Sequence, residues 1–263
     1  MILRQSVISH EDTKNRVPIE VDDYDLESFA PIVAEFGSHR FGYVVTPNVD
    51  HLIKFTEDAE FRKCYQTARW VLLDSRVAAH LIRWRYGLNL RVCTGSDLTA
   101  RLLEKIVNSN DDIVIIGSST ANVETVRRRY GLAKVRHYDP PMGFIHDPAA
   151  VEHCLNFIEA SSPFRFCLLA VGSPQQEHLA AALSSRGRAR GLALCIGASI
   201  NFLAGTERRA PAWMQRMSLE WLFRLLQNPR RLGTRYLVRG PKILSVLGKL
   251  QITLRRADCT TID

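Results

Sequence analysis

Short apolar runs alternate with helical patterns along most of this chain, at intervals of about 25–30 residues. The strand-like runs lie at 42–45, 70–73, 112–116, 134–138, 166–171 and 192–196, and the helical patterns at 25–36, 52–68, 77–86, 97–107 and 148–160. Strands that are separated by helices pair in parallel, because each crossover returns the chain to the same end of the sheet. The alternation therefore predicts an α/β fold, a mostly parallel sheet with helices on both faces. Residues 1–20 are expected to form a loose or edge segment.

Positive charge is concentrated near the C-terminal end. The 263-residue chain has a formal net charge of +8, and between Arg208 and Arg256 there are twelve Lys or Arg residues and a single acid, Glu220. The remaining residues comprise 23 basic and 26 acidic side chains. A local basic excess marks a face that binds an anionic partner. The sequence thus predicts two parts, an α/β domain at 1–207 and an Arg-rich C-terminal appendage at 208–263.

Two stretches of the appendage have apolar residues at helical spacing. The first, 211–227, places Trp213, Met214, Met217, Trp221, Leu222 and Leu225 on one stripe, and the second, from Pro241, places Ile243, Leu244, Leu247, Leu250 and Leu254 within one arc. Basic amphipathic helices suit a membrane interface; the alternative is packing on the sheet or on a second subunit. Both explanations fit the first stretch equally well. The pattern of the second favours the membrane.

Other features of the chain exclude several classes of protein. The six cysteines have no paired spacing, and the histidines have no ligand spacing, so we expect neither a disulfide framework nor a zinc site. Residues 5–20 are polar, unlike a signal peptide, and no apolar run approaches 18 residues. We therefore expect a cytoplasmic protein next to a membrane.

Three of the predicted strands end in small-residue turns that enter helices, at Gly117, Gly172 and Gly197. In an open α/β sheet, ligands bind outside the carboxyl ends of the strands, where such turns let the backbone approach phosphate oxygens. None of the turns matches a G-x-G-x-x-G motif or a phosphate-binding loop, which argues against a dinucleotide oxidoreductase or an ATPase. Glycine also serves tight turns sterically, so a nucleotide-type ligand and a purely steric role both stay open.

Carboxylates follow several of the strands. Asp74 comes directly after an apolar run, where low-dielectric surroundings raise a carboxylate's pKa and make it a usable general base; the alternative is a helix cap. Asp50 lies at another strand end, and Asp97 is expected to cap a helix. Asp23 and Asp25 have the D-x-D spacing of some metal-dependent sugar transferases, but an acidic first helical turn explains them better.

Several motifs of this chain occur together in one known family. They are Thr46-Pro47-Asn48; the strand end at Asp74; Arg91 with Thr94-Gly95-Ser96-Asp97-Leu98; Gly172-Ser173-Pro174-Gln175-Gln176-Glu177; Gly197-Ala198-Ser199-Ile200-Asn201-Phe202; and Arg209-Ala210-Pro211-Ala212-Trp213-Met214-Gln215-Arg216 with Leu219-Glu220-Trp221. Over about residues 40–235 they resemble the WecG/TagA/CpsF family of glycosyltransferases. The resemblance implies a Rossmann-like fold and an inverting, metal-independent enzyme with no cofactor. It also implies a UDP-sugar donor, a polyprenyl-diphosphate-linked saccharide acceptor, and peripheral binding to the inner face of the cytoplasmic membrane.

The same resemblance implies roles for individual residues. Asp74 corresponds to the proposed catalytic base, Thr46 and Asn48 lie beside the transferring sugar, and Gln176 is the active-site glutamine. Arg209 and Arg216 match appendage arginines that face the diphosphates, with Arg224 as a third. The remaining substrate-binding candidates are Arg91, Gly117, Phe144, Gly172, Ser173, Gly197, Ser199 and Asn201.

The chain departs from the family pattern next to the predicted base, where Ser75-Arg76 stands in place of a more usual glycine. Further departures are Gly143-Phe144-Ile145 and Ser199-Ile200-Asn201-Phe202. The donor hexose, of the N-acetylmannosamine type or glucose, therefore stays open, as does self-association. Two other hypotheses compete: a non-catalytic nucleic-acid-binding protein, suggested by the basic appendage, and a nucleotide-binding subunit without activity. The basic region lacks the interleaved aromatic residues of nucleic-acid platforms, and we expect no nucleic-acid partner.

Overall fold

A six-stranded sheet forms the centre of the computed structural model, which describes residues 16–255. Its strands are β2 (Phe41–Val45), β3 (Trp70–Val71), β4 (Asp112–Ile116), β5 (Lys134–Tyr138), β6 (Phe166–Leu169) and β7 (Gly191–Cys195). They are arranged in the order β3-β2-β7-β6-β4-β5, and every pair is parallel. The predicted α/β fold is confirmed, and the carboxyl ends of all six strands meet at one edge.

Helices cover both faces of this sheet because successive residues of its central strands, which point to opposite faces, are apolar. Val44, Ile113 and Ile115 belong to one buried cluster, whereas Val45 and Val114 belong to the other. The first cluster includes residues of α1 (Leu26–Glu35), α5 (Gly95–Arg101), α6 (Thr120–Arg129) and α9 (Ser199–Ala204). The second includes residues of α2 (Val49–Glu57), α3 (Ala59–Gln66), α4 (Arg76–Tyr86), α7 (Pro148–Ala160) and α8 (Gln175–Arg186). Burial of both faces is typical of parallel sheets.

Two of the predicted helices are divided. The pattern at 52–68 is interrupted by Asp58, whose carboxylate accepts hydrogen bonds from the backbone N–H groups of Glu60 and Phe61 and starts α3 as a new helix. The pattern at 97–107 begins as α5 and continues as a π-helix at Leu102–Ile106. Apolar periodicity persists through both interruptions, which is why the sequence pattern did not reveal them.

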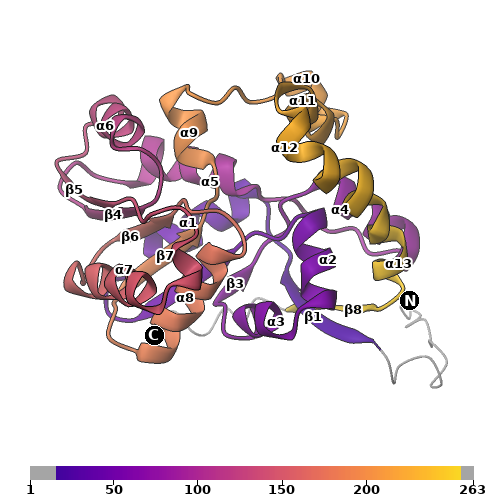
Figure 1. Ribbon diagram of the computed structural model, residues 1–263, viewed down its shortest axis with the longest axis horizontal. Coiled ribbons are helices and arrows are strands. Elements are labelled where there is room, and N and C mark those ends of the chain that lie inside the picture. The colour runs from indigo at the N-terminus through magenta and orange to yellow at the C-terminus, as the bar shows by residue number, and fades with distance from the viewer. Residues whose placement is uncertain (1–15, 256–263) are drawn as a thin grey trace.

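The C-terminal appendage is a series of short helices beside the sheet, next to α2 and α4 (Figure 1). They are α10 (Ala212–Arg216), α11 (Glu220–Gln227), α12 (Pro229–Gly233), the π-helix η3 (Thr234–Arg239), the 3₁₀ turn η4 (Gly240–Lys242) and α13 (Ile243–Leu247). The single helix predicted over 211–227 is wrong. Ser218 has a φ of +63°, in the left-handed region, and separates α10 from α11.

The prediction of a second amphipathic helix, from Pro241 to Leu254, is also wrong beyond Leu247. Residues Leu250–Arg255 form the strand β8, which pairs in parallel with β1 (Val17–Asp22) in a separate two-stranded sheet. Ile243, Leu247 and Leu250 are buried in the core, so this part of the arc faces protein. Apolar residues at 250, 252 and 254 fit a strand as well as a helix, and pairing with β1 decides between them.

The described helices are short. Within residues 16–255, none is both long enough and apolar enough to cross a membrane.

The strand assignment of β8 predicts unequal effects of two leucine substitutions. Leu250 is fully buried, so Leu250→Ala is expected to lower the free energy of unfolding by about 2–5 kcal/mol, through lost burial and a residual cavity. Leu254 is 40% exposed, and Leu254→Ala is the matched control with a change below about 1 kcal/mol. Urea denaturation measures both. Equal effects would contradict the strand.

Candidate active site

A pocket of roughly 370 Å³ lies between the carboxyl ends of β2 and β3 and the appendage. Its walls on the sheet side come from the loops after the two strands, from α2 and α4, and from Thr94 before α5. Its other wall belongs to the appendage. The lining residues are Asn48, Val49, Asp50, Asp74, Ser75, Arg76, Val77, Thr94, Gln215, Ser218, Glu220, Trp221, Arg224, Arg235, Tyr236, Gly240, Pro241, Ile243 and Leu244.

Asp74 is held in this pocket by the end of β3. Its backbone N–H donates to the Pro47 carbonyl (2.8 Å), and the next residue, Ser75, caps α4, so the capping role considered for Asp74 belongs to its neighbour. Burial and, to a smaller extent, Glu220 raise the pKa of the Asp74 carboxyl to about 7, against the opposing effects of Arg224, the Gly95 N–H and Arg209. A carboxylate with this pKa exchanges protons readily near neutral pH.

Asn48 and Thr46 follow β2 and occupy different places. Asn48 lines the pocket and caps α2, its side-chain oxygen accepting from the N–H groups of Asp50 and His51. Thr46 is buried beneath the loop, where its hydroxyl donates to the Cys195 carbonyl at the end of β7 (3.3 Å). A Cβ on Gly95 would lie only 3.1 Å from that hydroxyl oxygen. Thr46 therefore fixes the spacing between the loop after β2, the end of β7 and the start of α5. Asn48 lies in the pocket lining.

Gln176 is buried and uses both ends of its amide inside the protein. Its oxygen accepts from the Gly197 N–H (2.9 Å), and its Nε2 donates to the Glu177 carboxylate (2.8 Å). The same Glu177 oxygen lies 3.3 Å from Nε2 of His51, whose Nδ1 accepts from the Asn48 N–H (3.4 Å). A continuous buried chain thus connects the turn after β7 with Asn48. Sequence reasoning missed Glu177 and His51.

The three glycine turns lie at neighbouring strand ends, outside the lining of the pocket. Gly117 (φ +85°) has no room for a side chain, because a Cβ would lie 2.7 Å from the Val171 side chain. Gly172 (φ +80°) and Gly197 (φ +54°) also need glycine for their backbone, but nothing lies within 4 Å of where their Cβ would be. The turn at Gly117 is therefore explained by packing. The two others leave space above the backbone.

The side chains of Ser199 and Asn201 are engaged within the protein, whereas the buried Ser173 hydroxyl has no hydrogen-bond partner among the described residues. The Ser199 hydroxyl donates to the Ile196 carbonyl, and the Asn201 oxygen accepts from Ser118 and Asn122. The backbone carbonyl of Ser173 accepts from Lys54 (3.4 Å). These contacts shape the turns after β4, β6 and β7.

Two candidates lie away from the pocket. Phe144 is buried in the core, in a 3₁₀ turn at Phe144–His146. The backbone N–H of Arg91 donates to the Asp23 carboxylate (2.8 Å), and the half-exposed guanidinium lies 4.0 Å from the same carboxylate. Asp25 caps α1. The D-x-D pair is thus occupied with local structure, as the acidic-turn interpretation predicts.

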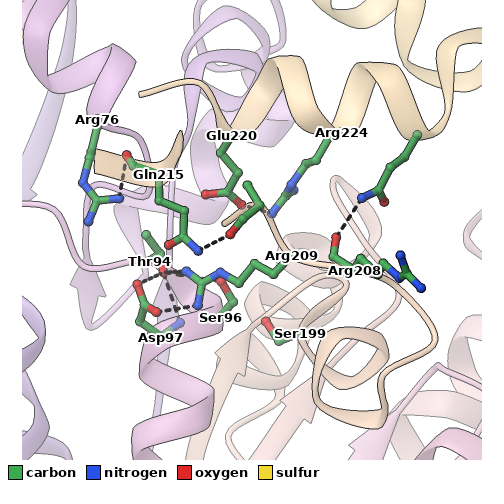
Figure 2. A network of polar contacts seen from close by, with 12 residues as sticks. Arg76, Thr94, Ser96, Asp97, Ser199, Arg208, Arg209, Gln215, Glu220 and Arg224 are labelled. Carbon is green, nitrogen blue, oxygen red and sulfur yellow. Dashed lines mark hydrogen bonds and ion pairs between the residues drawn. The ribbon is translucent and has the colours of Figure 1, made fainter. Parts of the chain in front are cut away.

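The appendage arginines take three different positions, of which Figure 2 shows those of Arg209 and Arg224. Arg209 pairs with Asp97 (2.5 Å) and approaches the Thr94 hydroxyl, which fastens the hinge before α10 to the start of α5. Arg224 lines the pocket, pairs with Glu220 (2.6 Å) and lies over the Phe202 ring of α9 (5.1 Å). Arg216 is exposed on α10, outside the pocket lining.

Arg235 lines the pocket without having been singled out from the sequence. Its guanidinium lies 3.5 Å from the Asp50 carboxylate, which Lys54 also approaches (3.3 Å). Burial raises the pKa of Asp50, but these cations outweigh it and leave the pKa below its usual value. Glu220 stood out in the sequence as the single acid of a basic segment but was not assigned to the site, whereas nothing in the sequence marks Arg235 among its neighbours.

Positive charge around Asp74 therefore comes from guanidinium groups. In the part of the chain that the structure describes, no group of three or more His, Cys, Asp or Glu side chains is arranged to hold a metal ion.

Fold and site together describe an α/β protein with a carboxylate of raised pKa beside an arginine-rich wall. Comparison with known sequences makes the class specific: the chain belongs to the WecG/TagA/CpsF family of glycosyl transferases, whose model matches residues 15–257. A relative from Bacillus spizizenii, N-acetylglucosaminyldiphosphoundecaprenol N-acetyl-beta-D-mannosaminyltransferase, is 25% identical over 229 residues, covering 83% of this chain and 85% of the relative. The protein is a glycosyltransferase, as the motifs predicted.

The buried chain through Gln176 predicts that Glu177 matters for turnover although it lies behind the pocket. Glu177→Ala removes the acceptor shared by Gln176 and His51, so kcat should fall on the order of 10- to 100-fold through misplacement of Asn48 and the Gly197 turn. Glu177→Gln keeps an oxygen in that place and should retain most activity. Steady-state kinetics, with thermal unfolding to confirm folding, measure both. Equal loss in the two variants would show that charge, not positioning, is what Glu177 supplies.

Proposed function

We propose that this protein transfers a hexosyl unit from a UDP-sugar to an undecaprenyl-diphosphate-linked saccharide, with inversion and without a metal ion, in the synthesis of a cell-surface polysaccharide. The observation that carries the proposal is Asp74, a carboxylate of pKa about 7 in a pocket that faces Arg224 and Arg235. The family of the chain and the acceptor in the name of its Bacillus spizizenii relative support the same reaction.

In the proposed reaction Asp74 accepts the proton of the acceptor hydroxyl. The hydroxyl oxygen forms a bond to the anomeric carbon of the donor, while the bond from that carbon to UDP breaks and its electron pair leaves with UDP. Attack and departure take place on opposite faces of the sugar, which inverts the configuration. The nucleotide has space above Gly172 and Gly197, and guanidinium groups supply positive charge for the departing diphosphate.

The exposed surface of the appendage supports binding to the inner face of the cytoplasmic membrane. Most of the exposed large apolar side chains among the described residues belong to it: Trp213, Met217, Leu226, Leu237, Val238, Leu244 and Leu254. Together with the basic excess after Arg208, they suit an anionic bilayer surface.

Replacing Asp74 separates catalysis from stability. Asp74→Asn should lower kcat by about 10²- to 10⁴-fold, because no base remains, with UDP binding retained. The folded-state pKa of about 7 exceeds the ordinary value of 3.8, so the free energy of unfolding falls as the pH rises from 3.8 to about 7 and stays low at higher pH. Asp74→Asn should therefore raise Tm at pH 8, and the gain should vanish near pH 4. Near-normal turnover would remove Asp74 from its role.

The pH profile offers a test in both directions. Asp74 works deprotonated, so kcat/KM should fall below about pH 7. Glu220 raises the pKa of Asp74 and Arg209 lowers it, so Glu220→Gln should move this acid limb to lower pH and Arg209→Gln to higher pH. Initial rates between pH 5 and pH 9 measure the limb. An acid limb of kcat/KM that lies at the same pH in both variants as in the unmodified protein would contradict the assignment of Asp74 as the base.

Donor class and metal independence are tested with the unmodified protein. Among UDP-glucose, UDP-N-acetylglucosamine, UDP-N-acetylmannosamine and UDP-uronic acids, the donor should raise Tm most, and UDP alone should raise it measurably. EDTA should leave the initial rate unchanged. Activity that disappears in EDTA and returns with a divalent cation would refute the metal-free mechanism.

Membrane binding is tested with surface substitutions, because truncation after Glu207 would also remove β8 and the buried residues of α13. Leu237→Ser with Val238→Ser should weaken co-sedimentation with vesicles that contain phosphatidylglycerol. Met142→Ser, at an exposed methionine outside the appendage, is the matched control. Unchanged co-sedimentation of the double variant would argue against this surface.

A further inference from the structure

The pocket is polar where it meets the sheet and apolar where it meets the end of the appendage. Asn48, Asp74 and Thr94 enter it from the loops at the strand ends. Tyr236, Pro241, Ile243 and Leu244 enter it from the run η3-η4-α13, and Trp221 enters from α11. The Trp221 and Tyr236 rings lie 6.1 Å apart and form a common apolar wall.

The apolar part of the pocket reaches solvent at Leu244. Thr94, on the polar side, is buried, whereas Leu244 lines the pocket and is 59% exposed. Leu237, next to Tyr236, is 62% exposed. A pocket for a purely polar ligand has no need of an apolar opening, and exposed apolar area costs free energy in water. The opening therefore suits a ligand with a hydrocarbon end that continues outside the pocket.

Two cations adjoin this apolar wall. Arg224 lies on the same helix as Trp221, and the Arg235 guanidinium lies 5.8 Å from the ring centre of Tyr236. Each is paired with a carboxylate of the pocket, Arg224 with Glu220 and Arg235 with Asp50. Guanidinium groups bind phosphate oxygens in preference to most other groups. The lining thus combines a carboxylate base, guanidinium groups, aromatic rings and aliphatic side chains.

We propose that Trp221, Tyr236 and Leu244 form a subsite for the first isoprenyl units of a polyprenyl diphosphate, with the chain leaving the pocket past Leu244. The inference rests on the proposed function, since it assigns the acceptor to this pocket. It adds that the enzyme binds part of the lipid tail itself, independently of any bilayer. The lipid diphosphate lies at Arg235, which leaves Arg224, over the Phe202 ring of α9, for the diphosphate of the departing UDP. The saccharide points towards Asp74.

The test uses soluble diphosphate esters and needs neither donor nor acceptor sugar. Titration calorimetry of the full chain compares methyl diphosphate with geranyl diphosphate, below the concentration at which the latter forms micelles. Geranyl diphosphate should bind at least tenfold more tightly. Trp221→Ala and Leu244→Ser should reduce that ratio several-fold and leave the affinity for methyl diphosphate nearly unchanged.

Control variants distinguish binding of the hydrocarbon chain in the subsite from non-specific binding to exposed apolar side chains. Leu226→Ser, at a leucine of α11 that is 70% exposed and outside the pocket lining, should leave the ratio intact. Arg235→Gln should weaken both esters alike. Leu244 is exposed, so its replacement keeps the proposal testable should Trp221→Ala fail to fold.

The outcomes also distinguish this inference from the proposed function. Equal affinity for the two esters, or a ratio that both pocket variants leave unchanged, would overturn the subsite and leave these side chains as bilayer contacts. A chain-length preference in binding without sugar transfer to any lipid-linked acceptor would support the subsite and refute the glycosyltransfer assigned to it.

Discussion

Arginine–carboxylate pairs hold the C-terminal appendage against the carboxyl edge of the sheet. Arg209 reaches Asp97 at the start of α5, Arg235 reaches Asp50 on α2, and Arg239 lies 3.7 Å from Glu57 on the same helix. Isolated surface pairs contribute little, but Asp50 is largely buried and Asp97 is enclosed with Thr94, so these pairs are less screened by water. Without these ion pairs the appendage would not cover Asp74, which would then lie at an open edge of the sheet. The raised pKa of Asp74 depends on this cover, because burial is its main cause.

The appendage brings both signs of charge to the site. Glu220 binds Arg224 and also raises the pKa of Asp74, so the one acid of a basic segment opposes the effect of the arginines on that carboxyl. Burial is the main cause of the raised pKa, and without Glu220 the arginines would lower that pKa further. The pocket wall thus carries guanidinium groups while the pKa of Asp74 stays at about 7.

The sequence predicted the sheet, because burial on both faces makes the central strands continuous apolar runs. It also placed Asp74 correctly at the end of such a run, next to the edge of the sheet where the pocket lies. The apolar residues at 243–254 led to a wrong helix prediction because their spacing fits both a helical period of 3.6 and a strand period of 2. Only pairing with β1, which is distant in sequence, makes residues 250–255 a strand. Gly117 and Gly172 look alike in sequence, but a Cβ on Gly117 would meet Val171 and Ala170, whereas a Cβ on Gly172 would meet nothing within 4 Å beyond its chain neighbours. Which arginine pairs with which carboxylate also depends on tertiary structure. For this reason the sequence analysis missed Arg235, which lines the pocket, and selected Arg216, which is exposed outside it.

Pairing between β1 and β8 joins residues near the two extremes of the described chain, and Asp22 of β1 accepts a hydrogen bond from the Val71 N–H of β3. During synthesis β1 is made before the six strands of the main sheet, and its partner strand β8 is made after all of them. The six-stranded sheet can form before β8 is made, while the pocket wall between α10 and α13 is fixed at its far end only when β8 pairs with β1. A nascent chain would thus acquire the glycine turns at the strand ends first and the appendage wall of its pocket last.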